Sequence, residues 1–248
     1  MVDSFSIIIP TLNEEKFLPQ LLNSISNQDF TGSLEVIIVD GGSDDRTIEV
    51  AKSYQPRLRN LQIFESSKGV SQQRNYGAEK AKYDYLIFLD ADTTLPKQFL
   101  SKVAGKLNDQ ENFVCLPLIL PLKGSVVDYI FVAAAYKFFF IVSFFKPIVT
   151  GMCLITTKEN HNKIGGFNEN VAFAEDIDYG LRSIKQGAKY HLYLSPHLFA
   201  STRRKNQINR FRLALLWIKW YLITARNGAI TDSSKYKYQY GSHSTKSS

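Results

Sequence analysis

Two aspartates separated by one alanine follow a strongly apolar run of the sequence. Asp90, Ala91 and Asp92 come directly after residues 85–89, which read Tyr-Leu-Ile-Phe-Leu and are typical of a buried strand. Hard cations such as Mg²⁺ and Mn²⁺ bind carboxylate oxygens and leave positions open for substrate phosphates. The pair therefore indicates a divalent-cation site that would neutralise a diphosphate leaving group. The alternative is a solvated turn, in which aspartate is common.

A further aspartate, Asp40, follows the apolar residues 36–39 and precedes two glycines. Its carboxylate could accept a hydrogen bond from a base N–H or a ribose hydroxyl, and Gly41 would let the backbone approach a ligand closely. No Gly-x-Gly-x-x-Gly follows either of the first two expected strands, which argues against a nicotinamide enzyme. Taken alone, Asp-Gly-Gly is better explained as a turn between a strand and a helix.

Basic residues occur at two places that would suit phosphate. Lys68 and Arg74 bracket the start of an expected helix over residues 70–81, and cations beside a helix N-terminus attract phosphate. Arg203 and Arg204 follow an expected strand, and paired guanidinium groups suit phosphate oxygens. The alternatives are a solvated helix face for the first pair and a membrane-surface anchor for the second.

Two acids begin a later amphipathic segment. Glu175 and Asp176 precede apolar residues at 177, 181 and 184, which are spaced as on one face of a helix. A carboxylate at this position could act as the general base that deprotonates an acceptor hydroxyl. The alternative is that both acids only stabilise the first turn through the helix dipole.

Alternating strand and helix patterns must position these residues. Apolar runs at 6–9, 36–39, 61–64 and 85–89 alternate with segments of helical period. This order predicts an α/β fold with a mostly parallel sheet covered by helices. Ligands of such sheets bind beyond the carboxyl ends of the strands. Polar clusters follow three of these runs, at Asn13 and Glu14, at Asp40, and at the Asp90–Asp92 pair.

Taken in order, the motifs resemble those of the inverting glycosyltransferases of family 2, which have the GT-A fold. The resemblance covers roughly residues 5–205, and the ordered set is far more specific than any one motif. The matching segments are residues 7–14 (IIIPTLNE), 36–45 (VIIVDGGSDD), 68–69 (KG), 74–77 (RNYG), 90–92 (DAD), 165–169 (GGFNE) and 175–176 (ED).

The resemblance implies a role for each motif. Asp40 would contact the nucleotide base, and Asp90 and Asp92 would bind ribose, diphosphate and metal, with Asp92 favoured as the direct ligand. Asp176 would be the catalytic base, and Glu175 would help to bind the acceptor. One in-line displacement at the anomeric carbon would invert its configuration. The nucleotide-sugar site would contain Pro10, Thr11, Asn13, Glu14, Asp40, Gly41, Lys68, Arg74, Asp90, Ala91, Asp92, Arg203 and Arg204.

The resemblance also limits the reaction. Processive members of the family carry Gln-x-x-Arg-Trp and membrane spans after the base, whereas this chain has Ser-Thr-Arg-Arg at residues 201–204. Transfer of a single sugar is therefore favoured over polymer synthesis. The implied donor is a nucleoside diphosphate sugar, with uracil favoured as the base by family tendency, and either Mn²⁺ or Mg²⁺ would serve.

Bulk composition is compatible with this interpretation. The 248 residues carry a formal charge of +7, which favours a polyanionic partner. Two isolated cysteines argue against a zinc framework or disulfide scaffold. An expected strand close to the N-terminus leaves no room for a signal peptide, so a cytoplasmic location is expected. We expect a catalytic domain over residues 1–205, divided into a nucleotide-binding half (1–95) and an acceptor half (96–205) with an apolar helical insertion at about 124–147.

Two apolar segments suggest a membrane surface. In residues 206–230, Arg212, Lys219 and Arg226 form a basic stripe on an apolar, aromatic helix, which is typical of a helix lying among lipid headgroups. Residues 129–145 are apolar but contain Lys137 and are short for a span of ~30 Å. A peripheral location on the cytosolic face and a lipid-linked acceptor are expected. Packing on the catalytic domain or a dimer interface is the alternative, and residues 231–248 are expected to be disordered.

Two other functions fit parts of the sequence. A sugar nucleotidyltransferase shares the acid after a strand but usually has a glycine-rich basic loop after the first strand, where this chain reads Thr-Leu-Asn-Glu-Glu at residues 11–15. A non-enzymatic basic module that binds nucleotide or lipid explains the charge but not the carboxylates. Binding of nucleic acid is not expected.

Overall fold

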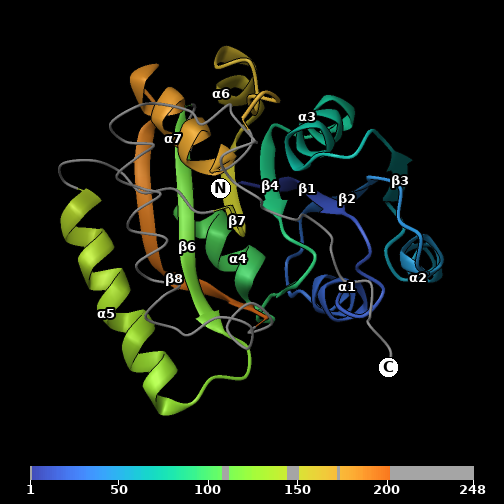
Figure 1. The fold of residues 1–248 in the computed structure, drawn as a ribbon, viewed down its shortest axis with the longest axis horizontal. Helices are drawn as coiled ribbons and strands as arrows, with labels where there is room; N and C mark the ends of the chain where they lie inside the picture. The colour runs from blue at the N-terminus through green and yellow to red at the C-terminus, as the bar shows by residue number, and fades with distance from the viewer. Residues whose placement is uncertain (1, 108–111, 144–150, 172–173, 202–248) are drawn as a thin grey trace.

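The computed structural model describes residues 2–107, 112–143, 151–171 and 174–201. Its strands are β1 (Ser4–Thr11), β2 (Ser33–Asp40), β3 (Leu61–Glu65), β4 (Tyr85–Leu89), β5 (Thr93–Thr94), β6 (Phe113–Pro121), β7 (Cys153–Thr157) and β8 (Lys189–Ala200). They form one sheet in the order β3-β2-β1-β4-β7-β6-β8-β5 (Figure 1). Strands β1 to β4 pair in parallel, whereas β7 runs antiparallel to both β4 and β6.

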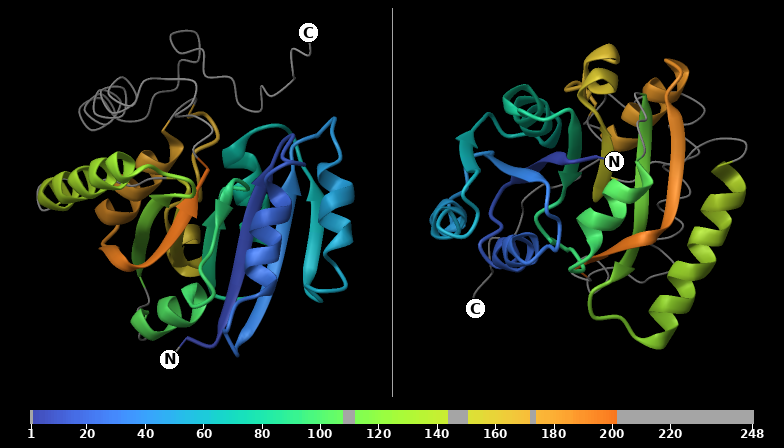
Figure 2. Two further views of the ribbon diagram at one scale, coloured as in Figure 1. Left: turned by 90° about the horizontal axis from the view of Figure 1, so that it is seen from below. Right: turned by 180° about the vertical axis from the view of Figure 1, so that it is seen from behind.

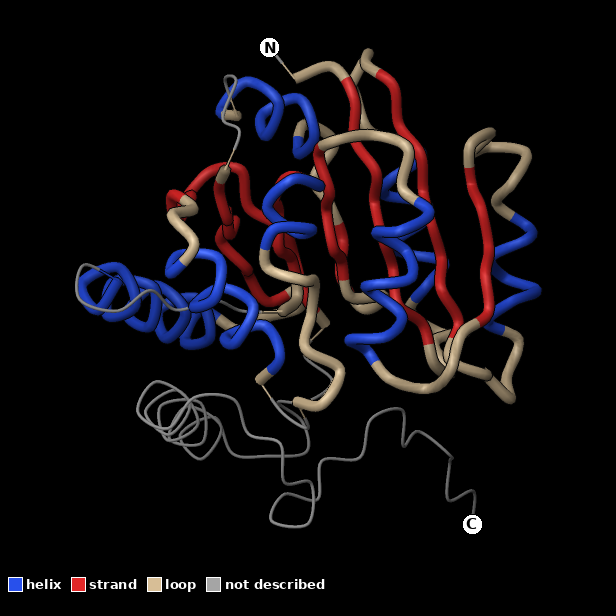
Figure 3. Tube along the Cα trace, turned by 90° about the horizontal axis from the view of Figure 1, so that it is seen from above, coloured by secondary structure: helices blue, strands red, loops and turns tan. Residues whose placement is uncertain are grey.

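The sheet is buried on both faces, as the unbroken apolar strands require. In β1, Ile7 and Ile9 join one apolar cluster and Ile8 joins the other, because successive side chains point to opposite faces. The first face is covered by α1 (Leu18–Ser26), α2 (Thr47–Ser53) and α4 (Phe99–Lys106). The opposite face is covered by α3 (Val70–Lys80), α6 (Lys158–Lys163) and α7 (Glu175–Lys185), so the sheet lies between two helical layers (Figures 2 and 3).

One helix packs unusually close to the sheet. A Cβ added to Gly77 of α3 would lie 2.5 Å from Ile8 Cγ2 and 3.2 Å from Val39 Cγ2. Only a residue without a side chain permits this approach, so α3 rests directly on β1 and β2. The approach brings the polar start of α3 to the carboxyl ends of these strands.

Strand β8 connects the second half of the sheet to the residues that follow β4. Strand β8 pairs in parallel with β6 through a register shift between Pro117 and Leu118, and a cis Ser195–Pro196 bond lies in the same stretch of β8. The end of β8 then pairs antiparallel with β5, which directly follows Asp92. As a result, Ser201 donates its N–H to the Asp92 carbonyl (2.9 Å).

Helix α5 (Val126–Ser143) lies along the outer edge of this half (Figure 1). Its first turn is capped by Asp128, whose carboxylate accepts hydrogen bonds from the N–H and the hydroxyl of Ser125 (both 2.7 Å). The tyrosine hydroxyl of Tyr136 accepts from the N–H of Ile119 and donates to the carbonyl of Pro117, which fastens the helix to β6. Within the described residues, the structure contains no helix that is both long enough and apolar enough for a membrane span.

The predicted α/β class with a mostly parallel sheet flanked by helices is confirmed. The helix predicted over residues 70–81 ends at Lys80. The insertion predicted at about 124–147 is helical over Val126–Ser143. The segments predicted at 206–230 and 231–248 lie outside the described residues.

Candidate active site

Asp40 is the last residue of β2 and lies opposite Thr11, the last residue of β1. Its side chain is buried, and each carboxylate oxygen accepts two hydrogen bonds. Oδ1 accepts from the hydroxyls of Thr11 (2.8 Å) and Ser43 (2.6 Å), and Oδ2 accepts from the N–H groups of Gly42 (3.0 Å) and Ser43 (2.7 Å). The carboxylate therefore holds together the turn that follows β2, at the carboxyl ends of the strands.

The loops that follow β1 and β2 are joined side by side. Asn13 adopts a φ of 56°, in the left-handed region that asparagine tolerates better than most residues. Its N–H donates to Ser43 Oγ (2.8 Å), and its Oδ1 accepts from the N–H of Asp44 (2.9 Å). The N–H of Glu14 donates to Thr47 Oγ1 (2.8 Å). One rim of the candidate site is thus formed by Pro10, Thr11, Asn13, Glu14 and Asp40.

Gln73 of α3 binds the backbone of this rim through its side-chain amide. This residue was not predicted from the sequence. Its Nε2 donates to the carbonyls of Thr11 and Val39 (both 2.7 Å), where β1 and β2 end. The amide occupies the space in front of Gly41, since a Cβ on Gly41 would lie 3.2 Å from it. A glutamine inside a largely polar helix carries no signal of burial, so only the folded structure reveals its position.

Arg74 joins the carboxylates of two distant elements. Its guanidinium is 2% exposed and donates through Nη2 to Asp90 Oδ1 (2.9 Å) and through Nη1 to Glu175 Oε1 (3.0 Å). Nη2 also donates to the carbonyl of Gly151 (3.0 Å), and the group lies 5.1 Å from the ring centre of Phe167. Arg74 was predicted at a phosphate, but here it brings together acids from the end of β4 and the start of α7.

Asp176 lies in the first turn of α7, beside this cluster. A Cβ on Gly151 would lie 3.1 Å from Asp176 Oδ2 and 3.3 Å from Arg74 Nη2, so the glycine allows the two groups to approach. Burial raises the pKa of Asp176 to about 7, the Glu175 carboxylate raises it as well, and the Arg74 guanidinium opposes the shift. A carboxylate with this pKa can take up a proton near neutral pH.

A second contact ties α3 to the turn that follows α6. Asn75 donates through Nδ2 to the Phe167 carbonyl (2.8 Å) and to Glu169 Oε1 (2.9 Å), and its Oδ1 accepts from the N–H of Phe167 (2.7 Å). Arg182 of α7 donates to the carbonyls of Ile164 and Gly166 (both 2.8 Å), on the same turn. The Gly-Gly-Phe turn is thereby fixed between α3 and α7.

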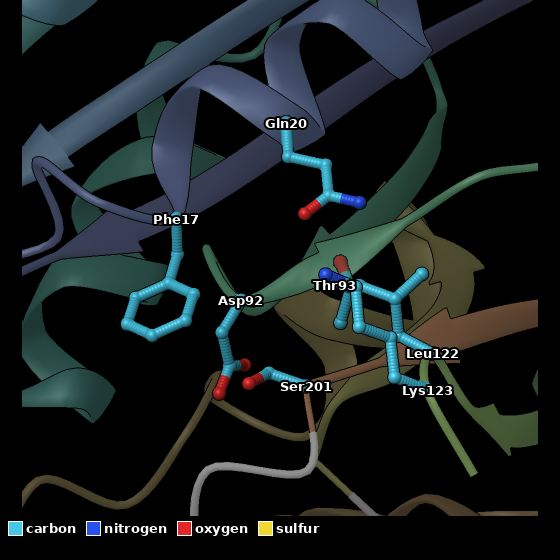
Figure 4. Close-up of a pocket in the computed structure, with 7 residues that line it drawn as sticks. All are labelled: Phe17, Gln20, Asp92, Thr93, Leu122, Lys123 and Ser201. Carbon is cyan, nitrogen blue, oxygen red and sulfur yellow. The ribbon is translucent and has the colours of Figure 1, made fainter.

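Asp92 lines a pocket of about 150 Å³ (Figure 4). In Figure 4 its carboxylate lies next to the Ser201 hydroxyl, with the Phe17 ring beside it. Ala91 is buried between the two aspartates. The pocket lies between α1, the residues after β4, the turn before α5 and the end of β8. Its lining residues are Phe17, Gln20, Asp92, Thr93, Leu122, Lys123 and Ser201.

Lys68 is exposed in the turn before α3, two residues ahead of its first residue Val70. Arg203 and Arg204 fall outside the described residues. The structure therefore brings together two clusters of predicted residues, one around Asp40 and one around Arg74, with Asp92 at the pocket nearby.

Comparison with known proteins decides the family. The family model described as Glycosyl transferase family 2 matches residues 6–139, which is more than half of the chain. The chain belongs to glycosyl transferase family 2. The match includes Asp40, Arg74 and the Asp90–Asp92 pair of this family 2 chain, and it ends within α5, before Glu175 and Asp176.

Curated relatives resemble the family 2 chain over part of their length. Poly(ribitol-phosphate) beta-N-acetylglucosaminyltransferase TarS of Staphylococcus aureus (strain Mu50) is 33% identical over 124 residues, which are 48% of this chain and 21% of TarS. A PGL/p-HBAD biosynthesis glycosyltransferase of Mycobacterium bovis (strain BCG) is 39% identical over 110 residues, which are 43% of each protein. The matched region thus spans less than half of either relative.

Solved structures place the family 2 chain in the GT-A fold. S. aureus TarS 1–349 in complex with UDP-GlcNAc matches 80% of this chain and 58% of that one, with a TM-score of 0.64 and 22% identity. The mannosyltransferase PcManGT from Pyrobaculum calidifontis, in complex with GDP-Man and Mn²⁺, matches 88% and 61% with a TM-score of 0.66 and 21% identity. At this identity the likeness establishes the fold.

Proposed function

We propose that this chain transfers a sugar from a nucleoside diphosphate sugar to an acceptor hydroxyl with inversion at the anomeric carbon. The observation that carries the proposal is the position of Asp176 at the start of α7, with a pKa of about 7, beside the Arg74 cluster. A carboxyl group in this pKa range is suited to general-base work at neutral pH.

The reaction needs one base and no enzyme nucleophile. Asp176 would accept the proton of the acceptor hydroxyl while the hydroxyl oxygen forms a bond to the anomeric carbon. The bond from that carbon to the diphosphate oxygen breaks, and the nucleoside diphosphate leaves with the bonding electron pair. Glu175, held by Arg74 at 3.0 Å, would orient the acceptor. Attack opposite to the leaving group inverts the configuration.

The residues present fit a divalent cation that is shared with the substrate. Asp90 and Asp92 supply hard carboxylate oxygens at the end of β4. Within the described residues, no group of three or more His, Cys, Asp or Glu side chains could hold a metal by itself. Two carboxylates together with diphosphate oxygens and water suit Mg²⁺ or Mn²⁺, with Asp92 as the direct ligand. When bound, the cation would neutralise charge on the leaving diphosphate.

The nucleotide would lie along the rim formed by Pro10, Thr11, Asn13, Glu14 and Asp40. Because Asp40 already accepts four hydrogen bonds, a base N–H could reach its carboxylate only by displacing a hydroxyl. We propose a uridine nucleotide, in line with the UDP-GlcNAc complex of TarS, while the GDP-Man complex of PcManGT makes a guanosine nucleotide the first comparison to run. Lys68, Arg203 and Arg204 are proposed at the diphosphate.

Thermal stabilisation of the full chain tests the donor site. UDP, GDP, dTDP and CDP are compared with and without Mn²⁺, in the wild type and in Asp92→Asn. A donor nucleotide present at 100 times its Kd should stabilise the fold by about 2.7 kcal/mol. We expect this shift for UDP with Mn²⁺ and its loss in Asp92→Asn. No shift for any nucleotide would contradict the proposal and favour a module that binds other anions.

Hydrolysis of the nucleotide sugar then tests the chemistry, since water can replace the acceptor. Asp176→Asn should still bind UDP with Mn²⁺ but release far less sugar. Formation of a nucleotide sugar from a nucleoside triphosphate and a sugar 1-phosphate, with release of pyrophosphate, would identify a nucleotidyltransferase and overturn the proposal.

A further inference from the structure

Helix α5 exposes several large apolar side chains along its length in the described structure. The side chains of Val126, Val127, Ile130, Phe138 and Ile141 are 76%, 57%, 63%, 49% and 52% exposed. Ordinary soluble proteins leave such residues exposed singly, and a contiguous set marks a surface for an apolar partner. Apart from Leu194, the exposed large hydrophobic side chains of the described residues lie on this helix.

The exposed positions follow helical spacing and form one stripe. Steps of three and four residues connect them along the length of the helix, so they share a face. The opposite face is fixed to β6 through the Tyr136 hydroxyl, and Tyr129 donates to the Pro121 carbonyl (3.1 Å). The α5 stripe is defined as Val126, Val127, Ile130, Ala133, Ala134, Lys137, Phe138 and Ile141.

We propose that the α5 stripe lies in the headgroup layer of an anionic lipid membrane. Aliphatic and aromatic side chains would enter the boundary of the acyl chains, as in interfacial helices. Lys137, exposed within the stripe, can extend its ammonium group to lipid phosphates while its methylenes stay among apolar neighbours. Lys123 before the helix and the formal charge of +7 complement the same anionic surface.

The size of the stripe argues against a second copy of the chain as the occupant. A helix of 18 residues is about 27 Å long and roughly 10 Å wide, so one face offers on the order of 300 Å². A stable dimer buries about 800 Å² on each partner. The stripe is too small for that role on its own, whereas one apolar helix face is what an interfacial helix buries at a lipid surface.

The location of the stripe connects it with the site. Lys123 lines the pocket that contains Asp92, and α5 begins three residues later. A membrane under α5 would bring this pocket close to the lipid surface, where a lipid-linked acceptor could reach it. The acceptor part of this inference rests on the proposed transfer reaction, but the membrane contact does not.

Vesicle flotation of the full chain tests the contact. The vesicles contain equal amounts of phosphatidylcholine and phosphatidylglycerol. Ile130→Ser removes a side chain from the stripe, and Leu194→Ser is its matched control, because both side chains are 63% exposed and Leu194 lies on β8. We expect about tenfold weaker partitioning for Ile130→Ser, equivalent to ~1.4 kcal/mol, and no change for Leu194→Ser. Lys137→Gln should weaken partitioning less, by about fivefold, and most clearly at low salt.

Three results would overturn the inference. The wild type could remain unbound, Ile130→Ser could float like the wild type because another segment binds lipid, or Ile130→Ser could dissociate a dimer in sedimentation without affecting flotation. Donor binding by the same proteins, measured in solution by thermal shift, separates this test from the proposed function. Loss of flotation with intact UDP binding concerns the membrane contact alone, and the converse concerns the reaction alone.

Discussion

The two halves of the molecule hold their functional residues in different ways. In the first half, short polar side chains of neighbouring loops bond to one another, as between Asn13 and Ser43 and between Glu14 and Thr47. In the second half, Glu175 is held by Arg74, which lies 101 residues earlier and belongs to the first half. The rim around Asp40 is therefore built within one half, whereas the acid cluster forms only where both halves meet.

The largest expected effect concerns the base itself. Asp176→Asn keeps the shape of the side chain but cannot accept a proton, so the rate of sugar transfer or nucleotide-sugar hydrolysis should fall about 10²- to 10⁴-fold. Asp178→Asn is the control on the same helix, because Asp178 pairs with Arg182 at 2.7 Å and belongs to no proposed reaction step. Equal losses in both variants would assign Asp176 a merely structural role.

Removal of Arg74 should lower the free energy of unfolding most, because Arg74 joins the two halves. Arg74→Ala leaves Asp90 and Glu175, each about one-fifth exposed, without their buried counter-ion, and should destabilise the fold by roughly 3–5 kcal/mol in urea unfolding. Arg46 is the matched control within the first half. Its side chain is 77% exposed and pairs with Glu15 at 3.4 Å, so Arg46→Ala should cost less than about 1 kcal/mol.

A conservative change sharpens the same comparison. Arg74→Lys keeps the charge but cannot reach Asp90, Glu175 and Gly151 with a planar, forked group. Its free energy of unfolding should lie between those of Arg74→Ala and the wild type. Donor binding should be less impaired than hydrolysis of the nucleotide sugar. A lysine variant that matches the wild type in both measurements would show that charge alone suffices and that the bridging geometry is unimportant.

The contrast between the halves also explains what could be predicted from the sequence. The strands ending at Asp40 and Asp90 were predicted because each apolar run and the polar residues after it are local in the sequence. The partners of Arg74 could not be predicted, since Gly151 and Glu175 become its neighbours only through the antiparallel pairing of β7 with β4. Gln73 was missed for a similar reason, because burial depends on what packs against a helix.

Two helical glycines test how tightly each half is packed. Gly77→Ala would place a Cβ 2.5 Å from Ile8 Cγ2 and should cost about 1–3 kcal/mol through overpacking. Gly105→Ala in α4 meets no atom within 4 Å and should gain up to about 1 kcal/mol from helix propensity. Chemical unfolding measures both. Stabilisation by both alanines would mean that α3 does not rest directly on the sheet.

A last pair of variants separates a carboxylate that stabilises the fold from one that is proposed to act as the base. Asp40 accepts four hydrogen bonds, so Asp40→Asn should lower the melting temperature.

The pKa of Asp176 is raised to about 7 from an unfolded value of ~3.9, so its ionisation destabilises the folded state progressively as pH rises between these values. Asp176→Asn removes that cost.

The advantage of Asp176→Asn over the wild type should therefore be absent below pH ~4, grow as pH rises, and level off above pH ~7. Each 1 kcal/mol would raise the melting temperature by ~2–4 °C. The measurement is made in EDTA without nucleotide, so that no bound cation offsets the charge on Asp176. A stability difference that does not vary with pH would mean that Asp176 ionises as easily in the folded chain as in the unfolded one. Asp176 would then lack the raised pKa on which its role as the base depends.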